Sequence, residues 1–331
     1  MGRTVAGYIV GAAFALAGAT FFAPAEAQPK MSRIGWLSNA GAGSGGSTEA
    51  SDFQQGLRDA GYAVKQNVVI EFRYADGDAN RLWDFASELA RLPVDVIVTS
   101  GDSAAEAAKR STKVVPIVAT EFGQDPVKSG LVSSLGRPEA NITGLASLSE
   151  DLWGKRLSLL HEFAPKVKKL TALWNPSNRS NAICVDELNA AAPALSMQIR
   201  AIGVRDPKSL EQAFQTIAKE PTDAIAICWD DITLAHAKAI ADFALSRRLP
   251  TVAPLKEYAK AGALLSYGAN LSAQRRRSAH FVKKILAGAK PAELPVERPT
   301  LFELVVNQQT ARALNLAVPL GIAMQTDELL E

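Results

Sequence analysis

Short apolar runs alternate with helical patterns along most of the chain. In the first half, runs rich in Val and Ile are separated by segments with apolar residues at helical spacing. Near-continuous apolar runs between helices indicate parallel strands that are buried on both faces. The strands predicted in this half are 34–38, 68–75, 95–100, 116–120 and 141–147.

The same pattern restarts after residue 150. A helix predicted at 151–163 precedes a second series of strands, and a helix at about 271–287 interrupts that series. We therefore expect an α/β fold of two doubly wound parallel-sheet lobes. Residues 288–300 contain three prolines and are predicted to be an extended crossing segment. The strands predicted in this half are 170–174, 198–204, 224–229, 251–253, 263–268 and 302–306.

The amino-terminal segment has a different pattern. Arg3 precedes an apolar run from Val5 to Ala23, and Ala25-Glu26-Ala27 forms a small-x-small cleavage site. This is typical of a secretory signal peptide, so residues 1–27 are predicted to be removed and the mature chain to begin at Gln28. An uncleaved membrane anchor is the alternative, because the apolar run approaches spanning length.

Charge and composition argue against nucleic acid as a partner. The formal net charge is +2, and a nearly balanced surface offers no electrostatic footprint for a phosphate backbone. The basic runs Lys166–Lys169 and Arg275–Arg277 are interpreted as solvated faces rather than binding patches.

Cysteine and histidine usage predicts no metal centre. Cys184 lies on a predicted helix and Cys228 in a predicted strand. We expect two separate buried thiols, although the two could pair in an oxidising compartment. His161, His236 and His280 lie on predicted helices without Cys or carboxylate neighbours at metal-ligand spacing.

The strand ends nominate the ligand-binding residues. In open α/β sheets, ligands bind where strand carboxyl ends meet loops and helix amino ends. Two such edges that face each other would form a cleft between the lobes. The candidates are Ser38, Asn39, Thr99, Ser100, Gly101, Asp102, Ser103, Thr120 and Glu121 in the first lobe, and Trp174, Asn175, Trp229, Asp230 and Tyr267 in the second.

Some of these polar candidates have an alternative, structural role. Either Asp102 or Ser103 could simply cap the helix that follows them. Asp231 is interpreted as the cap of a helix that starts near Ile232, which leaves Asp230 to pair with a ligand ammonium or hydroxyl.

The aromatic candidates also have alternatives. Tyr267 could face the cleft, or it could close the core and bond to backbone. Trp174 and Trp229 could hold a ring or a flat apolar group between them, or one indole could only pack between the lobes.

A set of phrases in fixed order resembles a known family. Each phrase is weak alone, but together they are similar to the periplasmic substrate-binding proteins of ABC transporters of the tryptophan/tyrosine type, over about residues 34–331. The phrases are FQQGLRDAGYAVKQNVVIEFRYADGD (53–78), DPVKSGLVSSLGRPEANITGL (125–145), GKRLSLLHEFAPKV (154–167), WNPSN (174–178), GALLSYGAN (262–270) and FELVVNQQTARALNLAVP (302–319).

The resemblance implies a type I periplasmic binding protein fold with a ligand cleft between its lobes. Three crossings are expected near 147–150, 268–272 and 297–302. The first lobe would comprise 28–147 plus 271–297, and the second 148–270 plus 298–331. It implies a monomeric, non-catalytic periplasmic protein that needs no cofactor and delivers a small solute to a membrane permease. The ATPase must be separate, because the chain has no phosphate-binding Gly-rich loop with the Lys-Ser/Thr signature.

The sequence departs from this family at two places. Relatives commonly carry Thr where Asp102 stands, and a carboxylate there would repel a ligand carboxylate. This places amino-acid recognition in doubt and favours a neutral or cationic ligand group. Relatives also tend to have smaller residues at Trp174 and Trp229, whereas Asp230 aligns with an acidic position that is common among them.

Two other functions fit parts of the sequence. A periplasmic ligand-sensing protein for a signalling receptor could use the same fold, and fold alone does not decide between sensing and transport. A secreted α/β enzyme would need a nucleophile–base pair, and the chain has no Gly-x-Ser-x-Gly elbow.

Overall fold

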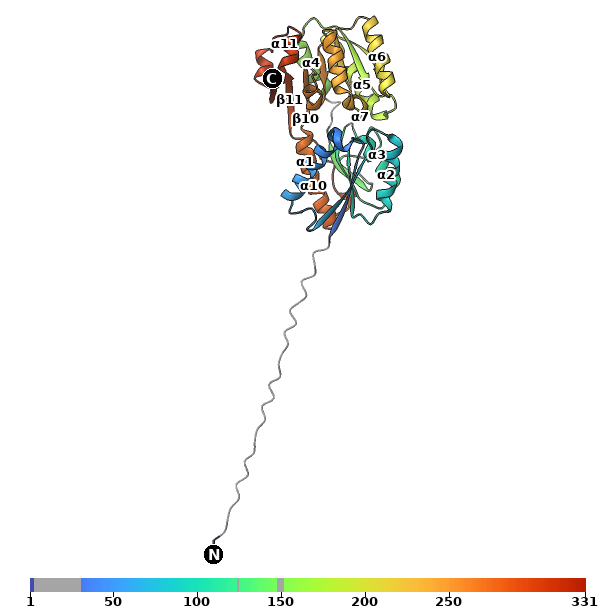
Figure 1. The fold of residues 1–331 in the computed structure, drawn as a ribbon, viewed down its shortest axis with the longest axis vertical. Coiled ribbons are helices and arrows are strands. Elements are labelled where there is room, and N and C mark those ends of the chain that lie inside the picture. Colours follow the sequence, from blue (N-terminus) through green and yellow to red (C-terminus); the bar gives the residue numbers. More distant parts are fainter. Residues whose placement is uncertain (3–30, 124, 148–151) are drawn as a thin grey trace. The chain divides into compact units, whose positions relative to one another are not determined.

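The computed structural model describes residues 1–2, 31–123, 125–147 and 152–331. The predicted signal peptide falls almost wholly on residues 3–30 and therefore lies outside the described residues. Within the described ranges, no helix combines the length and the apolar character needed to cross a bilayer. Residues Met31–Glu331 form one compact unit that contains two sheets (Figure 1).

The first sheet has five parallel strands in the order β2-β1-β3-β4-β5. All residues of β3, β4 and β5 are buried, as expected for a parallel sheet that is covered on both faces. Its strands are β1 (Ser32–Ser38), β2 (Val68–Tyr74), β3 (Val96–Ser100), β4 (Ile117–Phe122) and β5 (Ile142–Ala146).

Two pairs of helices cover this sheet. One core layer joins it to α2 and α3 through residues such as Leu82, Leu89 and Ala104, and the other joins it to α1 and α10 through Phe53 and Phe281. Of these four helices, α10 comes from far along the chain and lies beside α1 (Figure 1). These helices are α1 (Ser47–Asp59), α2 (Ala79–Arg91), α3 (Asp102–Ser111) and α10 (Leu271–Leu286).

The second sheet has seven strands in the order β12-β11-β10-β9-β8-β6-β7. Five of its six neighbouring strand pairs are parallel, but the β10–β11 pair is antiparallel, because the chain returns to this sheet from α10 in the opposite direction. Its strands are β6 (Lys169–Trp174), β7 (Gln198–Gly203), β8 (Ala224–Ile227), β9 (Thr251–Ala253), β10 (Leu265–Ala269), β11 (Phe302–Asn307) and β12 (Glu328–Leu330).

Helices again lie on both faces of the second sheet (Figure 1). A Trp153–Leu157–Leu160 layer packs on one face, and a layer with Leu210, Ile240 and Tyr258 packs on the other. These helices are α4 (Trp153–Phe163), α5 (Arg179–Ala191), α6 (Pro207–Lys219), α7 (Asp231–Ala235), α8 (Ala237–Ser246), α9 (Lys256–Lys260), α11 (Gln308–Ala313) and α12 (Leu320–Ala323).

The predicted α/β architecture with two mainly parallel sheets is confirmed. Strand β8 ends at Ile227, two residues before the predicted end, so Cys228 and Trp229 belong to the following turn. The predicted extended segment at 288–300 contains a short 3₁₀ helix (Pro291–Glu293) and a bridge between Leu145 and Glu297.

The chain passes between the two sheets at segments that lie side by side. The amide of Asn270, just after β10, donates to the carbonyl of Leu301, just before β11, at 3.0 Å. The amide of Ala146 in β5 donates to the carbonyl of Glu297 at 2.9 Å. Most of the crossing predicted at 147–150 lies outside the described residues, and the lobe boundaries given above stay a prediction.

Candidate ligand-binding site

A cavity of about 430 Å³ lies where the carboxyl ends of β1, β3 and β4 face helices α7, α8 and α9. Its size is in the range of small-molecule sites. Both sheets contribute to its lining, so it is a cleft between two α/β layers, as the strand-end argument predicts. Six predicted residues line it: Ser38, Asn39, Ser100, Gly101, Glu121 and Trp229.

The floor of the cavity holds a buried arginine between two carboxylates. Arg275 Nη2 lies 3.3 Å from Glu121 Oε1 and 3.5 Å from Glu49 Oε1. Arg275 is only 7% exposed and Glu121 only 1%. Because Arg275 is on α10, Glu49 on α1 and Glu121 at the end of β4, this triad ties three elements of the first lobe together.

Hydroxyl groups complete the coordination of both carboxylates. Ser38 Oγ donates to Glu49 Oε2 at 3.0 Å, and Ser100 Oγ donates to Glu121 Oε1 at 2.9 Å. Thr120 also donates to the Glu121 carboxylate. Three predicted ligand-binding hydroxyls therefore serve the carboxylates inside the protein.

The charges of Arg275 and Glu121 act on each other's pKa in opposition to burial. Burial raises the pKa of Glu121, and the Arg275 charge opposes that shift. Burial acts to lower the pKa of Arg275, but the charges of Glu121 and Glu49 outweigh it and raise that pKa overall. A buried ion pair of this kind is costly to break, because removing one partner leaves an uncompensated charge.

The helix α7 is capped by Asp230 and not, as the sequence predicted, by Asp231. Asp230 caps α7, because its side chain accepts from the Ile232 amide at 3.0 Å and forms a capping box with Thr233. Asp231, which the sequence suggested as the cap, is the first residue of α7 and lines the cavity.

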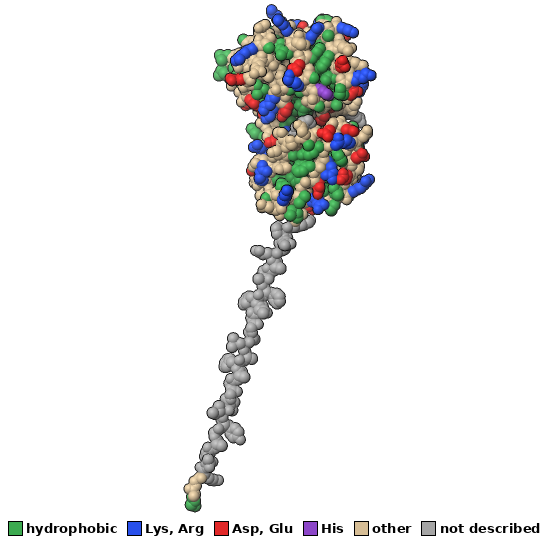
Figure 2. Space-filling view, in the orientation of Figure 1, with side chains coloured by type: hydrophobic (Ala, Val, Ile, Leu, Met, Phe, Trp, Pro, Cys, Tyr) green, Lys and Arg blue, Asp and Glu red, His purple; other side chains and the backbone are tan. Residues whose placement is uncertain are grey.

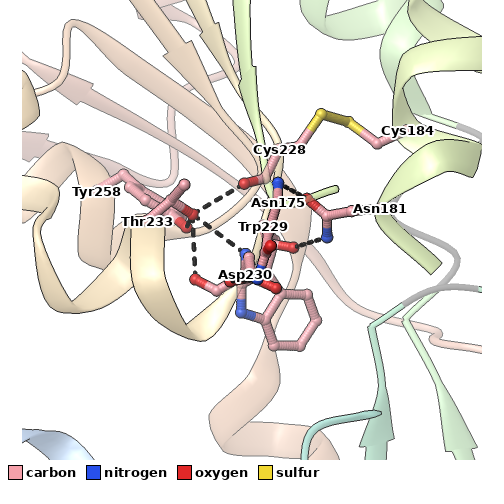
Figure 3. Close-up of a disulfide and its surroundings, with 8 residues drawn as sticks. All are labelled: Asn175, Asn181, Cys184, Cys228, Trp229, Asp230, Thr233 and Tyr258. Carbon is pink, nitrogen blue, oxygen red and sulfur yellow. Dashed lines mark hydrogen bonds between the residues drawn. A yellow bond between two sulfur atoms is a disulfide. The ribbon is translucent and has the colours of Figure 1, made fainter. Parts of the chain in front are cut away.

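Amide donors explain why Asp230 is the capping residue. Asn175 Nδ2 donates to Asp230 Oδ1 at 3.0 Å and Asn178 Nδ2 donates to Asp230 Oδ2 at 2.9 Å. Asp230 is only 5% exposed, so these amides replace the water that its carboxylate would otherwise bind. The predicted residue Asn175 thus orders this turn (Figure 3).

A disulfide joins the same turn to α5. Cys184 and Cys228 are bonded, which corrects our expectation of two separate thiols. Between them, Asn181 Nδ2 donates to the Trp229 carbonyl at 2.7 Å, and Asn181 Oδ1 accepts from the Asn175 amide at 3.1 Å. The turn is therefore fixed on one side, and the Trp229 indole points away from the disulfide (Figure 3).

Asp231 is a buried carboxyl group at the cavity with a raised pKa. Burial raises the pKa of Asp231 to about 7, and the charge of neighbouring Asp230 adds to the rise. Asn39 Nδ2 donates to Asp231 Oδ2 at 2.6 Å, and a hydrogen bond with Ser103 also favours the charged form. Because Asn39 and Ser103 come from the first lobe, Asp231 links the two sides of the cleft.

Trp229 and leucines form the apolar part of the cavity. Leu234, Leu255 and Leu271 line it together with the Trp229 indole. The indole also lies against the backbone of Gly123, where an added Cβ would come within 2.8 Å of the ring. Trp229 therefore fits the predicted role of an aromatic surface for a flat group.

The amino end of α3 has a carboxylate in its first turn but no side-chain cap. Gly101 precedes this helix with φ of 82°, a left-handed conformation that suits glycine, and it makes no side-chain cap. Asp102 Oδ1 accepts from the Gly123 amide at 3.0 Å, so Asp102 joins the ends of β3 and β4 rather than capping its own helix. Ser103 does not cap it either, and bonds with Asp231 instead.

A second cavity of about 590 Å³ adjoins the first and shares Asn39, Gly77 and Asp231 with it. Asp102, Ser103, Asn175 and Asp230 line this second cavity. The predicted site residues at the strand ends are thus divided between two neighbouring hollows.

Four predicted residues lie away from both cavities: Thr99, Thr120, Trp174 and Tyr267. Trp174 and Tyr267 pack against the core on the α4–α5 side of the second sheet, and Tyr267 stacks on Phe302 with ring centroids 6.2 Å apart. Tyr267 thus has the core role of its two alternatives. Thr120 is fully buried and donates to the Thr99 carbonyl at 3.2 Å.

Sequence reasoning missed several cavity residues. Glu49, Glu257 and Arg275 lie inside helices, not at strand ends, so the strand-end rule does not reach them. Arg275 belongs to a basic run that the sequence suggested to be a solvated face. That interpretation holds for the exposed Arg276 and Arg277 and fails for buried Arg275.

The surface outside the cavity is mixed in charge. Lys166, Lys168 and Lys169 are exposed, as expected of a solvated face. Figure 2 shows Lys and Arg interspersed with Asp and Glu over the visible face of residues 31–331. Within the described ranges there is no group of three His, Cys, Asp or Glu residues placed to hold a metal ion.

Comparison with known proteins identifies the family. Residues 44–329 match the family model described as ABC transporter substrate binding protein. The chain belongs to the ABC transporter substrate-binding protein family. It is therefore a binding protein and not an enzyme.

Individual relatives agree with this assignment. The chain is 27% identical over 265 residues to the "Tyrosine-binding protein" of Clostridioides difficile strain R20291, which covers 80% of this chain and 75% of the relative. Its fold matches a solved ABC domain in complex with L-Trp from Streptococcus pneumoniae, with a TM-score of 0.85 and 22% identity, over 90% of this chain and 99% of the other. A conserved domain protein from Vibrio cholerae matches with a TM-score of 0.84 and 24% identity, over 91% of this chain and 100% of the other.

Proposed function

We propose that this substrate-binding protein captures a small solute outside the cytoplasm and delivers it to the permease of an ABC importer. The observation that carries the proposal is the cavity between the two sheets, which residues of both lobes line. A ligand that touches both sides would hold the lobes together, and the permease would recognise that liganded form.

The cavity favours a flat ligand with polar ends. One wall is the Trp229 indole with three leucines, and the opposite wall carries Glu49, Glu121 and Arg275. An aromatic amino acid or a related flat molecule matches this division into apolar and polar walls. The relatives named for tyrosine and found with L-Trp support the same ligand size.

The proposed location is the periplasm. The predicted signal peptide supports export, and the Cys184–Cys228 disulfide fits an oxidising compartment. The predicted monomeric state and the separate permease and ATPase belong to the same proposal.

A thermal-shift screen of the mature chain, residues 28–331, tests the binding function. A ligand at a hundredfold excess over its Kd stabilises the folded state by about 2.7 kcal/mol, which raises Tm by several degrees at about 2–4 °C per kcal/mol. The screen should cover amino acids, aromatic acids, aromatic amines, nucleobases and sugars. We expect at least one class of flat small molecule to raise Tm.

The Trp229→Ala variant locates the binding. Its Tm shift with the same compound should be much smaller, while Trp174→Ala, in the core outside the cavity, serves as the matched aromatic control and keeps the ligand-induced shift. A panel without any stabilising compound, or a shift that Trp229→Ala leaves unchanged, would contradict the proposed site.

A further inference from the structure

Carboxyl groups outnumber cationic groups among the side chains that line the cavity. In the first lobe, two carboxyl groups, Glu49 and Glu121, lie against the single guanidinium group of Arg275. In the second lobe, Asp231 and Glu257 line the cavity. Glu257 is partly buried, and its charge helps to raise the pKa of Arg275.

The other charged side chains at the cavity do not offset this excess. Lys238, at the rim, is exposed and pairs with Asp242 on its own helix. Asp76 is exposed and pairs with Arg81 at 3.2 Å. The inner carboxyl groups of Asp231, Glu257 and the triad therefore outnumber Arg275, the one buried cation in the described lining of the cavity.

Two buried polar atoms at the cavity have no partner within the described residues. Asn39 Oδ1 is one, although its Nδ2 donates to Asp231. An acceptor beside a carboxylate is suited to a ligand group with several N–H donors, such as an ammonium. The other atom is Nε of Arg275, which suits an acceptor from the ligand.

A ligand acceptor at Arg275 does not need to be charged. Two carboxyl groups, those of Glu49 and Glu121, already lie within 3.5 Å of its guanidinium group. A neutral oxygen, such as a hydroxyl, would satisfy Nε without adding a third negative charge to this group.

The amino end of α3 is a poor position for a ligand carboxylate. A helix amino end with free N–H groups is the usual anion site, and α3 presents its amino end next to Gly101 at the cavity. However, Asp102 places a carboxylate in the first turn of α3 and takes up the nearby Gly123 amide at 3.0 Å. A second carboxylate from a ligand would meet repulsion here.

We propose that this cleft binds an organic cation with a flat apolar group, of the arylalkylamine class, in preference to a free amino acid. The proposal rests on the proposed function, because it specifies the ligand of the same cavity. The ammonium group lies beside Asp231 and Asn39, the ring lies on Trp229, and a hydroxyl on the ring reaches Arg275.

Calorimetric titration with three matched compounds tests this inference at pH 8. Tyramine, L-tyrosine and 3-(4-hydroxyphenyl)propionate share one ring and differ only in their ammonium and carboxylate groups. Tyramine should bind at least about tenfold more tightly than L-tyrosine, a difference of about 1.4 kcal/mol, and the propionate should bind most weakly.

The outcomes separate this inference from the proposed function. Binding of L-tyrosine as tightly as tyramine, or more tightly, would overturn the cation preference and leave a solute-binding cleft intact. Binding by none of the three would also overturn the inference, and a positive result in the broader screen would then still support the proposed function.

Variants assign the preference to particular carboxylates. Asp231→Asn should weaken tyramine binding by about tenfold or more, while Glu211→Gln, at an exposed position of α6, is the matched control and should leave it unchanged. Asp102→Thr should bring the affinity for L-tyrosine closer to the affinity for tyramine. Circular dichroism verifies that each variant is folded. An unchanged tyramine affinity in folded Asp231→Asn, or an unchanged ratio of the two affinities in folded Asp102→Thr, would contradict the assigned role.

Discussion

Asp231 is a buried carboxyl group at the cavity whose charged form is unfavourable. It lies next to Asp230, faces Glu49 across the cavity, and accepts a hydrogen bond from Asn39. Burial is the largest cause of its raised pKa, so the charged form of Asp231 is unfavourable in the free protein. A cationic ligand would stabilise the charged form of Asp231. The Asp231 charge would therefore lower the stability of the free protein and contribute to the binding free energy.

The stability of the free protein should therefore depend on Asp231 and pH. The pKa of Asp231 is about 7 in the folded protein against 3.8 as its ordinary value, so the folded state holds more protons between these values. Stability from this group is lost as pH rises through about 4 to 7. Asp231→Asn should remove that loss, so the variant should gain stability over the natural protein at pH 8 and gain much less at pH 4.5.

Urea denaturation of both proteins at the two pH values measures this difference. Glu211→Gln again provides the matched control, because it removes an exposed carboxylate outside the cavity. A variant that is equally stabilised or destabilised at both pH values would show that the Asp231 charge is not the cause.

Residue roles at this site were only partly predictable from the sequence. Adjacent carboxylates Asp230 and Asp231 look equivalent in the chain, and the choice of cap depends on the amides of Asn175 and Asn178, which approach from another loop. Trp229 was predictable, because it directly follows a buried strand whose end faces the cavity.

The turn after β8 is the element on which the second lobe's part of the site depends. It carries Trp229, Asp230 and Asp231 in succession, and three restraints fix it: the Asn181 bonds, the cap of α7 and the disulfide to α5. Rigid support of this kind holds binding side chains in place before a ligand arrives, which lowers the cost of ordering them.

Removal of the disulfide should destabilise the protein without abolishing its fold. The bond closes a loop with a sequence separation of 44, for which the chain-entropy estimate is roughly 4 kcal/mol. The double variant Cys184→Ala/Cys228→Ala should lose free energy of unfolding of about this size in urea denaturation, and its ligand affinity should fall because the Trp229 turn is less restrained.

Dithiothreitol supplies the control for this prediction. It should destabilise the natural protein and leave the double variant unaffected. Equal stability of the natural protein with and without the reductant, with thiol titration proving full reduction, would argue against a structural role for the bond.

At the scale of helices and strands, the sequence predicted the strands better than the packing between helices. Buried parallel strands have a clear signature of continuous apolar residues, and β1 to β11 were predicted, whereas β12 was not. Arg275 was missed because its burial depends on tertiary packing between α10 and α1. The two helices approach so closely that a Cβ on Gly56 would lie 2.1 Å from the Arg276 carbonyl, and this brings Arg275 next to Glu49.

For the whole molecule, the two lobes hold each other through few direct contacts around the cavity. Asn39 bonds Asp231, the Trp229 ring lies on Gly123, and Lys128 pairs with Glu187 at 3.3 Å on the exposed rim. The exposed Lys128–Glu187 pair contributes little to the free energy that holds the lobes together, because salt screens it. Carboxylates on both sides of the cavity repel one another, as the effect of Glu49 on the pKa of Asp231 shows.

These charges give a physical reason for closure that depends on ligand. Without a ligand, we expect repulsion between Glu49 and Asp231 to favour separation of the lobes about the segments near 268–272 and 297–302. With a ligand between them, the repulsion is neutralised and Trp229 gains an apolar partner. Backbone changes spread over a few residues at those segments suffice for such a hinge motion.

Small-angle X-ray scattering of the mature chain, with and without a saturating amount of the compound that raises Tm most, tests the central claim most directly. We predict that the radius of gyration is smaller with the compound, because the lobes close on it, and that Trp229→Ala reduces the change. Scattering curves that superimpose at saturation would contradict capture by closure and would leave a rigid pocket in its place.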